Sequence, residues 1–522
     1  MPGGLGLSRR DLLMLVCCAG APFMIMLDTN IVAVSLPSIA RDLHGEFTDV
    51  EWVVSAYLLP FAALLMPAGA LADRLGRRRI LFSGLAIFTL ASLACGLAPS
   101  LASLNAARAL QGVGAALQLS SSLAVIADAF REPTQRARVY AIWATVMGAA
   151  PSLGPVTGGA ITSYFGWRWA FLINVPIGAV LMALVAVTVR ESRDPDSTKL
   201  DLPGIAVFGS GLFVVVWALI SANRVGWGSD STLIKLLVGS ALLVAFVVVE
   251  RRQARPMIDL SIFRRLPAVG AAVATLGYAS SAQIMMTILP IYLQDAFGQS
   301  PAKAGLAMIP FALPLLIGPG IGGKLAARHS SRAIIGIGLS LSAVGNAIAA
   351  AAVWLGFGYW GAALGMFVIG SGAGLLNSET TKAQVSSVPP ERAGMASGLA
   401  ATTRFIGIIG GLAGLGAVLV VVCESSLRSL SMALPQSATA DFHELTLRII
   451  GGDVDSALSA VPEIARSSFS SAVQTGVTAA FGWALIVATC IAVVSGLVSR
   501  RLLGPGENHM EGGTAPQVAG GD

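Results

Sequence analysis

Residues 69–80 read GALADRLGRRRI, and this stretch decides how the rest of the chain is interpreted. One apolar run ends directly before it and another begins directly after it. Its arginines cannot enter hydrocarbon together, because a charged side chain at the centre of a bilayer costs roughly 2.5–3.5 kcal/mol. The stretch is therefore expected to be a short loop between two membrane-spanning helices.

The residue types in this loop each suggest a task. We expect Gly69 to let a neighbouring helix approach closely, and Gly76 to form a tight turn with positive φ. We expect Asp73 to accept hydrogen bonds from the N-terminus of the next helix and to neutralise nearby arginines. The basic residues should hold the loop in the cytoplasm, and they are Arg74, Arg77, Arg78 and Arg79.

The composition extends this interpretation to the whole chain. Of 522 residues, 55% are apolar and 12% are charged, whereas a soluble domain carries roughly 25% charged residues. We find fourteen apolar runs between residues 12 and 498, and about 20 residues suffice to cross a hydrocarbon core. The prediction is an all-α integral membrane protein with fourteen transmembrane helices.

The basic residues indicate how the chain is oriented. Counted from an internal N-terminus, most of the 34 Lys and Arg residues fall in the loops of one side. Because cytoplasmic loops collect Lys and Arg, both ends of the chain are expected in the cytoplasm of a bacterial cell, with the spans in its inner (plasma) membrane. This bias also explains the net charge of +6 without a nucleic-acid partner.

An internal repeat divides the chain. Residues 323–334 repeat the Gly, Leu, Ala, Arg and Ile pattern of residues 69–80 at constant spacing. Two related halves are a common transporter construction, with chance similarity of two basic loops as the alternative. The expected parts are a cytoplasmic N-terminus (1–11), an N-terminal six-helix bundle (12–190), a linker with two inserted helices (191–265), a C-terminal six-helix bundle (266–500) with an external loop (423–471), and a disordered cytoplasmic tail (501–522). Within the external loop, a helix is expected over 442–450.

The loop at 69–80 resembles the motif between the second and third helices of the major facilitator superfamily. Residues 27–37, 108–116 and 148–176 resemble the first-, fourth- and fifth-helix motifs of its fourteen-span drug:proton antiporters, the QacA/EmrB-type exporters. The resemblance implies the major facilitator fold and transport driven by a proton gradient, with no cofactor. The chain departs from the pattern at Asn30, Ala33 and Ala327, and the last leaves the second-half loop without an acid.

Two ionisable residues of opposite sign lie inside these motifs. Asp28 is about 15 Å and Arg108 about 10 Å below the outer boundary, measured along their helices. The long guanidinium side chain can bridge that difference, so we expect the two to be partners. The pair is either a static clamp between helices or a proton acceptor whose proton affinity depends on the arginine.

The fifth span carries a stripe of small residues and a proline, Gly154, Pro155, Gly158 and Gly159. Small residues let helices approach closely, and a proline kinks a helix. An ordinary helix contact and a specific role in exchange explain the stripe equally well.

A set of polar, aromatic and sulfur-containing residues could line an amphipathic cavity. Each also fits ordinary helix packing. They are Tyr57, Gln111, Gln118, Tyr278, Met285, Met286, Tyr292, Gln294, Asn377 and Arg404. We expect Arg404 to bond carbonyl groups or a polar side chain of a neighbouring helix, and Glu379 to lie near the inner surface.

The leading hypothesis is a proton-driven exporter of hydrophobic or cationic drugs that works by alternating access. Its alternatives are an exporter of one specific metabolite, such as an antibiotic or siderophore, and a membrane receptor without transport. A membrane enzyme would need a reactive cluster, and the four histidines are scattered over loops and tail. The sequence lacks a Gly-x-x-x-x-Gly-Lys-[Ser/Thr] run, which sets ATP drive aside. A periplasmic adaptor protein is a further candidate partner.

Overall fold

The computed structural model describes residues 8–130, 132–193, 201–253, 258, 260–387, 393–430, 442–452, 454 and 466–504. All regular structure in these ranges is helical. The first helices are α1 (Arg9–Leu43), α2 (Phe47–Leu75), α3 (Arg77–Gly96), α4 (Leu101–Ala129), α5 (Pro133–Phe165), α6 (Trp169–Leu172), α7 (Asn174–Thr188), α8 (Leu202–Val225) and α9 (Asp230–Arg252). The later ones are η1 (Leu260–Arg264), α10 (Leu266–Tyr278), η2 (Ala279–Gln283), α11 (Met285–Asp295), α12 (Pro301–Ala307), α13 (Ile309–Ala326), α14 (Ser331–Trp354), α15 (Gly358–Ser386), α16 (Ala393–Leu430), α17 (Phe442–Ile450) and α19 (Arg466–Leu502).

Fourteen stretches of these helices are long and apolar enough to cross a membrane, which confirms the predicted number. The sixth stretch combines α6 and α7, and the ninth combines α10, η2 and α11. The η2 segment is a turn of π-helix. Such turns inside α-helices are frequent at functional sites.

The helices continue beyond the apolar runs that predicted them. The first run was expected from residue 12, but α1 begins at Arg9, where Ser8 and Asp11 form a capping box. Likewise α16 ends at Leu430 and α19 begins at Arg466, so the loop predicted over 423–471 is shorter. Hydropathy marks the length in hydrocarbon, whereas helical hydrogen bonding continues into polar sequence.

The helix predicted over 442–450 is present as α17, and Gly452 after it has φ 93°. It contacts both α2 and α16. The remaining residues of that loop, and the tail from 505, lie outside the described ranges.

The same helix pairing occurs in both parts of the chain. The fourth span, α4, packs on α2 and α3, and α15 packs on α13 and α14 in the same way. Glycines make both contacts close: a Cβ on Gly84 would lie 3.0 Å from Gly114 O, and one on Gly338 would lie 3.2 Å from Gly372 O. The repeated pairing agrees with the repeat in the sequence.

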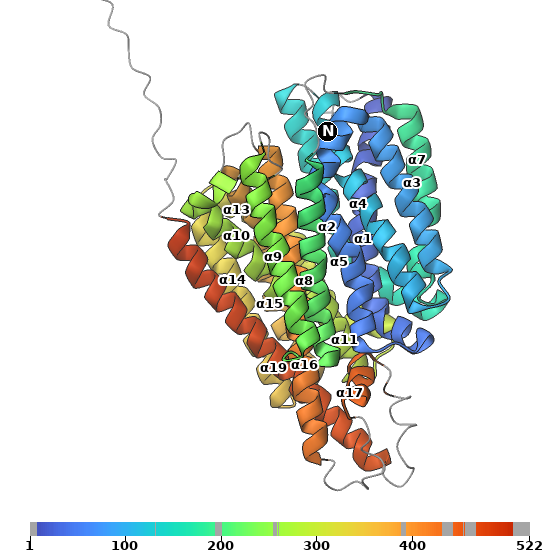
Figure 1. Ribbon diagram of the computed structural model, residues 1–522, viewed down its shortest axis with the longest axis vertical. Helices are drawn as coiled ribbons and strands as arrows, with labels where there is room; N and C mark the ends of the chain where they lie inside the picture. The colour runs from blue at the N-terminus through green and yellow to red at the C-terminus, as the bar shows by residue number, and fades with distance from the viewer. Residues whose placement is uncertain are drawn as a thin grey trace, which may run out of the picture.

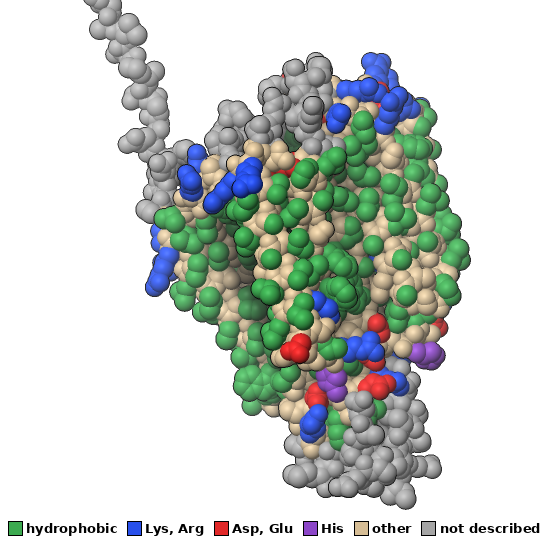
Figure 2. Space-filling model, in the orientation of Figure 1, with side chains coloured by type: hydrophobic (Ala, Val, Ile, Leu, Met, Phe, Trp, Pro, Cys, Tyr) green, Lys and Arg blue, Asp and Glu red, His purple; other side chains and the backbone are tan. Residues whose placement is uncertain are grey.

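Figure 1 shows α1–α5 and α7 on one side of the molecule and α10, α13–α16 and α19 on the other. Helices α8 and α9 pack on each other, and α8 also contacts α2 and α16. The beginning of α1 and the end of α19 lie toward the upper end, which we call the terminus end, and α17 lies at the opposite loop end. Lys and Arg side chains gather at the terminus end (Figure 2).

Close contacts join the two sides of the molecule at the loop end. A Cβ on Gly159 of α5 would overlap Pro301 O of α12, and one on Gly305 would overlap Pro155 O. Nearby, the Gln294 side chain of α11 donates to Val34 O of α1 at 3.0 Å. Backbone against backbone at these points leaves no space between α5 and α12.

Candidate functional site

Asp28 and Arg108 meet in the interior of the α1–α7 group. The Arg108 Nη1 donates to Asp28 Oδ2 at 2.7 Å. The two side chains are 0% and 1% exposed, respectively. The contact expected from their depths is therefore present, between α1 and α4.

Two neutral side chains complete the surroundings of the carboxylate. Gln111 Nε2 donates to Asp28 Oδ1 at 2.9 Å, and Asn174 Nδ2 donates to the same oxygen at 2.7 Å. Both amides also approach Ser92 Oγ, at 2.8 and 3.4 Å. Arg108, Gln111 and Asn174 thus direct three hydrogen-bond donors to one carboxyl group.

Arg108 is anchored independently of Asp28. Its Nε donates to Val53 O of α2 at 3.0 Å, and its Nη1 also donates to Gln111 Oε1 at 2.7 Å. Its Cζ lies 4.1 Å from the Tyr57 ring centre and 5.6 Å from that of Phe171. Hydrogen bonds and cation–π contacts thus fix the guanidinium between α2, α4 and α6.

Tyr57 and Gln111, which were predicted to line a substrate cavity, contact Arg108 in this cluster. Asn174 and Ser92 were not predicted to be site residues. Asn174 lies inside the resembling stretch 148–176, so a signal for it existed. Ser92 is an ordinary serine in an apolar helix, and only the packing of α3 on α4 brings it to the site.

The glycine stripe of α5 has two faces. A Cβ on Gly154 would overlap Asn30 of α1, and one on Gly158 would lie 2.8 Å from Ile31 Cα. Gly159 and Pro155 face α12, as described above. The helix therefore contacts the Asp28 helix along one row of residues and the other half of the molecule along the adjacent row.

The stretch 69–80, which was expected to be a loop, is helical except at Gly76, because α2 continues to Leu75 and α3 begins at Arg77. Gly76 forms the predicted turn, with φ 119°. Asp73 accepts from Arg77 Nε at 2.9 Å, and Arg77 Nη1 lies 3.6 Å from Asp128 Oδ1 of α4. This arginine links the loop to the end of the fourth span.

Two further expectations for this stretch are wrong. A Cβ on Gly69 would meet nothing within 4 Å, so no helix approaches closely there. The acceptor at the α3 N-terminus is Glu191, which accepts from Arg78 N at 3.2 Å, rather than Asp73. Asp73 lies one turn before the end of α2, where it is closer to the Arg77 side chain than to the free N–H groups of α3. Arg74 is exposed.

The second-half loop uses a different set of residues. Ser331, at the repeat position of Arg77, donates to Glu379 Oε1 at 2.6 Å, and Lys382 Nζ lies 3.1 Å from the same oxygen. Glu379, which was expected near the inner surface, contacts the first residue of α14 and the exposed Lys382, and its own side chain is 3% exposed. The acid missing at Ala327 is thus supplied by α15.

A small hollow lies between the two sides of the molecule, and it includes three of the predicted cavity residues, Tyr278, Met286 and Asn377. Its volume of about 10 Å³ has room for about one water molecule. Arg404 donates to Asn377 O at 2.6 Å, as expected for a bond to a neighbouring helix. Its Cζ also lies 5.3 Å from the Tyr278 ring.

The other predicted cavity residues lie elsewhere. Tyr292 packs on Phe481, with ring centres 5.0 Å apart, and Gln294 bridges to α1. Met285 is fully buried in the apolar core. Gln118 is also buried, and neither its Nε2 nor its Oε1 has a hydrogen-bond partner among the described residues.

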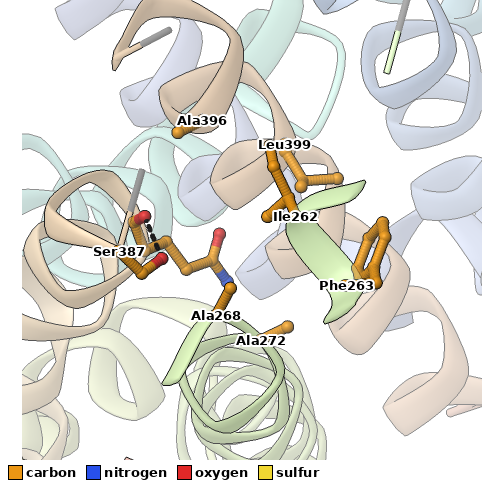
Figure 3. Close-up of a pocket in the computed structure, with 8 residues that line it drawn as sticks. Ile262, Phe263, Ala268, Ala272, Ser387, Ala396 and Leu399 are labelled. Atoms are coloured by element: carbon orange, nitrogen blue, oxygen red, sulfur yellow. Dashed lines mark hydrogen bonds between the residues drawn. The ribbon is translucent and has the colours of Figure 1, made fainter. Parts of the chain in front are cut away.

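A second hollow of similar size lies between η1, α10, α15 and α16 (Figure 3). Its lining is mostly apolar, with Ile262, Phe263 and Leu399 among its residues. The nearby Gln384 donates to Thr275 Oγ1 at 2.9 Å. This hollow lies apart from the predicted site residues.

Comparison with known proteins agrees with this geometry. The chain is 35% identical to the multidrug resistance protein Stp of Mycobacterium tuberculosis, over 82% of this chain and 80% of that protein. It is 36% identical to the cephamycin export protein of Amycolatopsis lactamdurans (76% and 83% covered). It is 33% identical to the tetracenomycin C resistance and export protein of Streptomyces glaucescens (79% and 77% covered).

Among solved structures, an inward-facing, unoccupied bacterial homologue of the human lysosomal transporter Spinster aligns with a TM-score of 0.65 at 18% identity. The alignment covers 95% of this chain and 98% of that one. At this identity the likeness concerns the fold alone. The model of the Major Facilitator Superfamily matches residues 18–412. With fourteen apolar helices and relatives of this kind, the chain is a multi-pass plasma-membrane protein and belongs to the major facilitator superfamily.

Proposed function

We propose that this protein expels hydrophobic or cationic drugs across the bacterial plasma membrane in exchange for protons. The names of its relatives support the class of substrate, since they include a multidrug resistance protein and two antibiotic exporters. The observation that carries the exchange is the buried Asp28 carboxylate with Arg108 as its partner. The proton gradient is the driving force, and the proposal needs no bound cofactor.

Proton binding at Asp28 would change how α1 is held. Two unit charges 4 Å apart attract by about 4 kcal/mol at an effective dielectric constant of 20. A proton on Asp28 removes this attraction, and it replaces an acceptor of three hydrogen bonds by a group that also donates. The contacts that hold α1 against α4 and α7 would then weaken.

Helix α5 would pass this change to the other half. Asn30 and Ile31, two and three residues after Asp28, pack against Gly154 and Gly158. The adjacent face of α5, with Pro155 and Gly159, packs on α12. A shift of α1 therefore requires α5 to move, and a shift of α5 alters the contact that joins the halves.

Aromatic rings provide a second connection. Tyr57, which covers Arg108, lies 5.8 Å from Phe61, and Phe61 lies 4.4 Å from Phe405 of α16. Phe405 follows Arg404, whose partners Tyr278 and Asn377 line the central hollow. We propose that the substrate cavity develops from this hollow, whose methionine and aromatic side chains suit varied apolar ligands.

Alternating access follows from two six-helix bundles, 12–190 and 266–500, moving around the inserted pair α8 and α9. With both termini in the cytoplasm, the loop end faces outward, and the close α5–α12 contact closes it. The Asp73–Arg77–Asp128 contacts at the terminus end join α2, α3 and α4 within the first half, and they would keep this end of the half together as it moves. A proton and a substrate act by shifting the balance between the two states of alternating access.

An exporter dedicated to one antibiotic is the second candidate, because two relatives are named for a single compound each. A growth-inhibition panel of dyes, biocides and antibiotics separates the two. Protection against several unrelated cations supports the multidrug function, and protection against one compound supports the dedicated exporter.

The exchange itself is tested by substrate-induced proton release from detergent-solubilised protein. We expect the wild type to release protons and Asp28→Asn to release none at that site. Asp42→Asn is the matched control, because Asp42 is an exposed carboxylate on the same helix, paired with Arg168 at 2.6 Å. Equal release from wild type and Asp28→Asn would remove Asp28 as the coupling site.

A further inference from the structure

Glu51 is a further buried carboxyl group, at the loop end. Glu51 of α2 is 1% exposed, and Asn223 of α8 is 3% exposed. The Asn223 Nδ2 lies 3.2 Å from Glu51 Oε2 and 3.4 Å from Oε1. This amide is the partner that the described residues offer to the Glu51 side chain.

The third wall of the site is α16. A Cβ on Gly416 would lie 2.6 Å from Glu51 Oε1 and 2.7 Å from the Phe47 ring. Glu51 is therefore enclosed by α2 of the first half, α8 of the inserted pair and α16 of the second half. Water has no access while these three helices stay together.

The charged groups on the surrounding helices are engaged with one another. Arg224, next to Asn223, lies 3.6 Å from Glu46. On α17, Arg448 pairs with Glu444, and His443 approaches Glu424 of α16 at 2.7 Å. On α16, Arg428 also pairs with Glu424. Within the described part of the chain, none of these cations forms an ion pair with Glu51, in contrast to Arg108 with Asp28.

The hydrogen-bonding groups of the Asn223 amide indicate which protonation state of Glu51 can satisfy both of them. Its Oδ1 is buried and has no hydrogen-bond partner among the described residues. An ionised carboxylate accepts the Nδ2–H but offers nothing to Oδ1. A neutral carboxyl group accepts from Nδ2–H with one oxygen and donates its O–H to Oδ1 with the other. The pair is complete only when Glu51 carries a proton, which also avoids a buried unpaired charge.

We infer that Glu51 and Asn223 form a second proton-binding site, occupied while the loop end is closed. Separation of α16 from α2 would admit water beside Glu51, and the carboxyl group would then ionise. Since proton affinity and helix contact are linked reciprocally, proton binding at Glu51 favours the closed loop end. The role in transport rests on the proposed exchange, whereas the proton site does not.

The site is tested by infrared spectroscopy of the purified full-length protein at neutral pH. A protonated carboxylic acid has a carbonyl stretch that a carboxylate lacks. We expect this band in the wild type, its loss in Glu51→Gln and a shift of its frequency in Asn223→Ala. Glu51→Gln keeps the size of the side chain and an amide pair with Asn223, so it should fold.

Two variants control the assignment. Burial raises the pKa of the Glu46 carboxyl, so Glu46→Gln tests whether that neighbour produces the band. Glu444→Gln removes a half-exposed carboxylate that is paired with Arg448. The band should persist in both variants. An unchanged band in Glu51→Gln, or its loss in Glu46→Gln instead, would overturn the inference.

A second measurement concerns the link to the loop end. Gly416→Leu forces α16 away from Glu51, so the band should weaken in this variant, and deuterium exchange of the acid proton should accelerate. A band that stays as strong and as slowly exchanging as in wild type would refute the closed-state dependence. If the wild type shows the band but no substrate-induced proton release, the exchange proposal fails while the proton site stands.

Discussion

Replacing Arg108 by glutamine should make the stability of this protein fall as pH rises. The change removes the cation 2.7 Å from Asp28 but keeps side-chain groups for Gln111 and Val53. Breaking a buried ion pair by removing one partner typically costs about 3–5 kcal/mol. Protonation of Asp28 would remove much of this cost, because the neutral acid carries no unpaired charge.

The sign follows from proton linkage. In the unfolded chain, the aspartate has its ordinary pKa of about 3.9 and is ionised near neutrality. The folded variant would hold a proton that the unfolded chain has lost, so the free energy of unfolding decreases by about 1.4 kcal/mol per pH unit. At this slope, a cost of about 3–5 kcal/mol corresponds to about 2–4 pH units. The stability should therefore decrease over this range of pH above the ordinary pKa of aspartate.

The assay is thermal unfolding of the detergent-purified protein as a function of pH. The double variant Asp28→Asn/Arg108→Gln lacks the carboxyl group and is the matched control. We expect the single variant to lose stability with rising pH relative to the double variant. Parallel pH profiles would show that Arg108 does not hold the ionised carboxylate, and the reasoning about the pair would then be wrong.

Three further predictions concern α5, the first loop and topology. Gly154→Ala should lower thermal stability by about 1–3 kcal/mol and slow drug efflux from cells, because the added Cβ would overlap α1. Gly148→Ala is the control: its Cβ has open space, and it should be neutral in both assays. Gly76→Ala should lower stability by about 1–3 kcal/mol, because φ is 119° at this position. Gly69→Ala is the control, since its Cβ meets no neighbour among the described residues. Equal melting temperatures of the two variants would contradict this prediction. A reporter active only outside the cell should be active when fused within 431–440 and silent after residue 504, and the reverse pattern would refute the proposed orientation.

The spans could be predicted from the sequence because the thickness of hydrocarbon imposes a length and a composition on each of them. The Asp28–Arg108 contact could be predicted because two charges at similar depth need each other. Depth, however, does not say which face of a helix points to which neighbour. The contacts of Tyr57 and Gln111 with Arg108 could therefore not be predicted, and their role in a substrate cavity stays a prediction.

Contacts that depend on how helices pair could not be predicted. The Glu51–Asn223 pair joins α2 to an inserted helix whose position no repeat specifies. Gly69 was misjudged for a related reason, since a small residue permits a close approach without requiring one. The helix at 442–450 could be predicted because Gly451 and Gly452 end it within the sequence itself.

The separate anchoring of Arg108 has an electrostatic consequence for substrates. Val53 O, Gln111 and the Tyr57 ring keep the guanidinium in place whether or not Asp28 is ionised. The cluster is therefore neutral overall before a proton binds and carries one fixed positive charge afterwards. Under the proposed exchange, that charge would repel a cationic drug from a distance in a low-dielectric interior, and proton and drug would exclude one another without sharing any contact. An uncharged drug would not experience this repulsion, and its exchange with protons would be less tightly coupled.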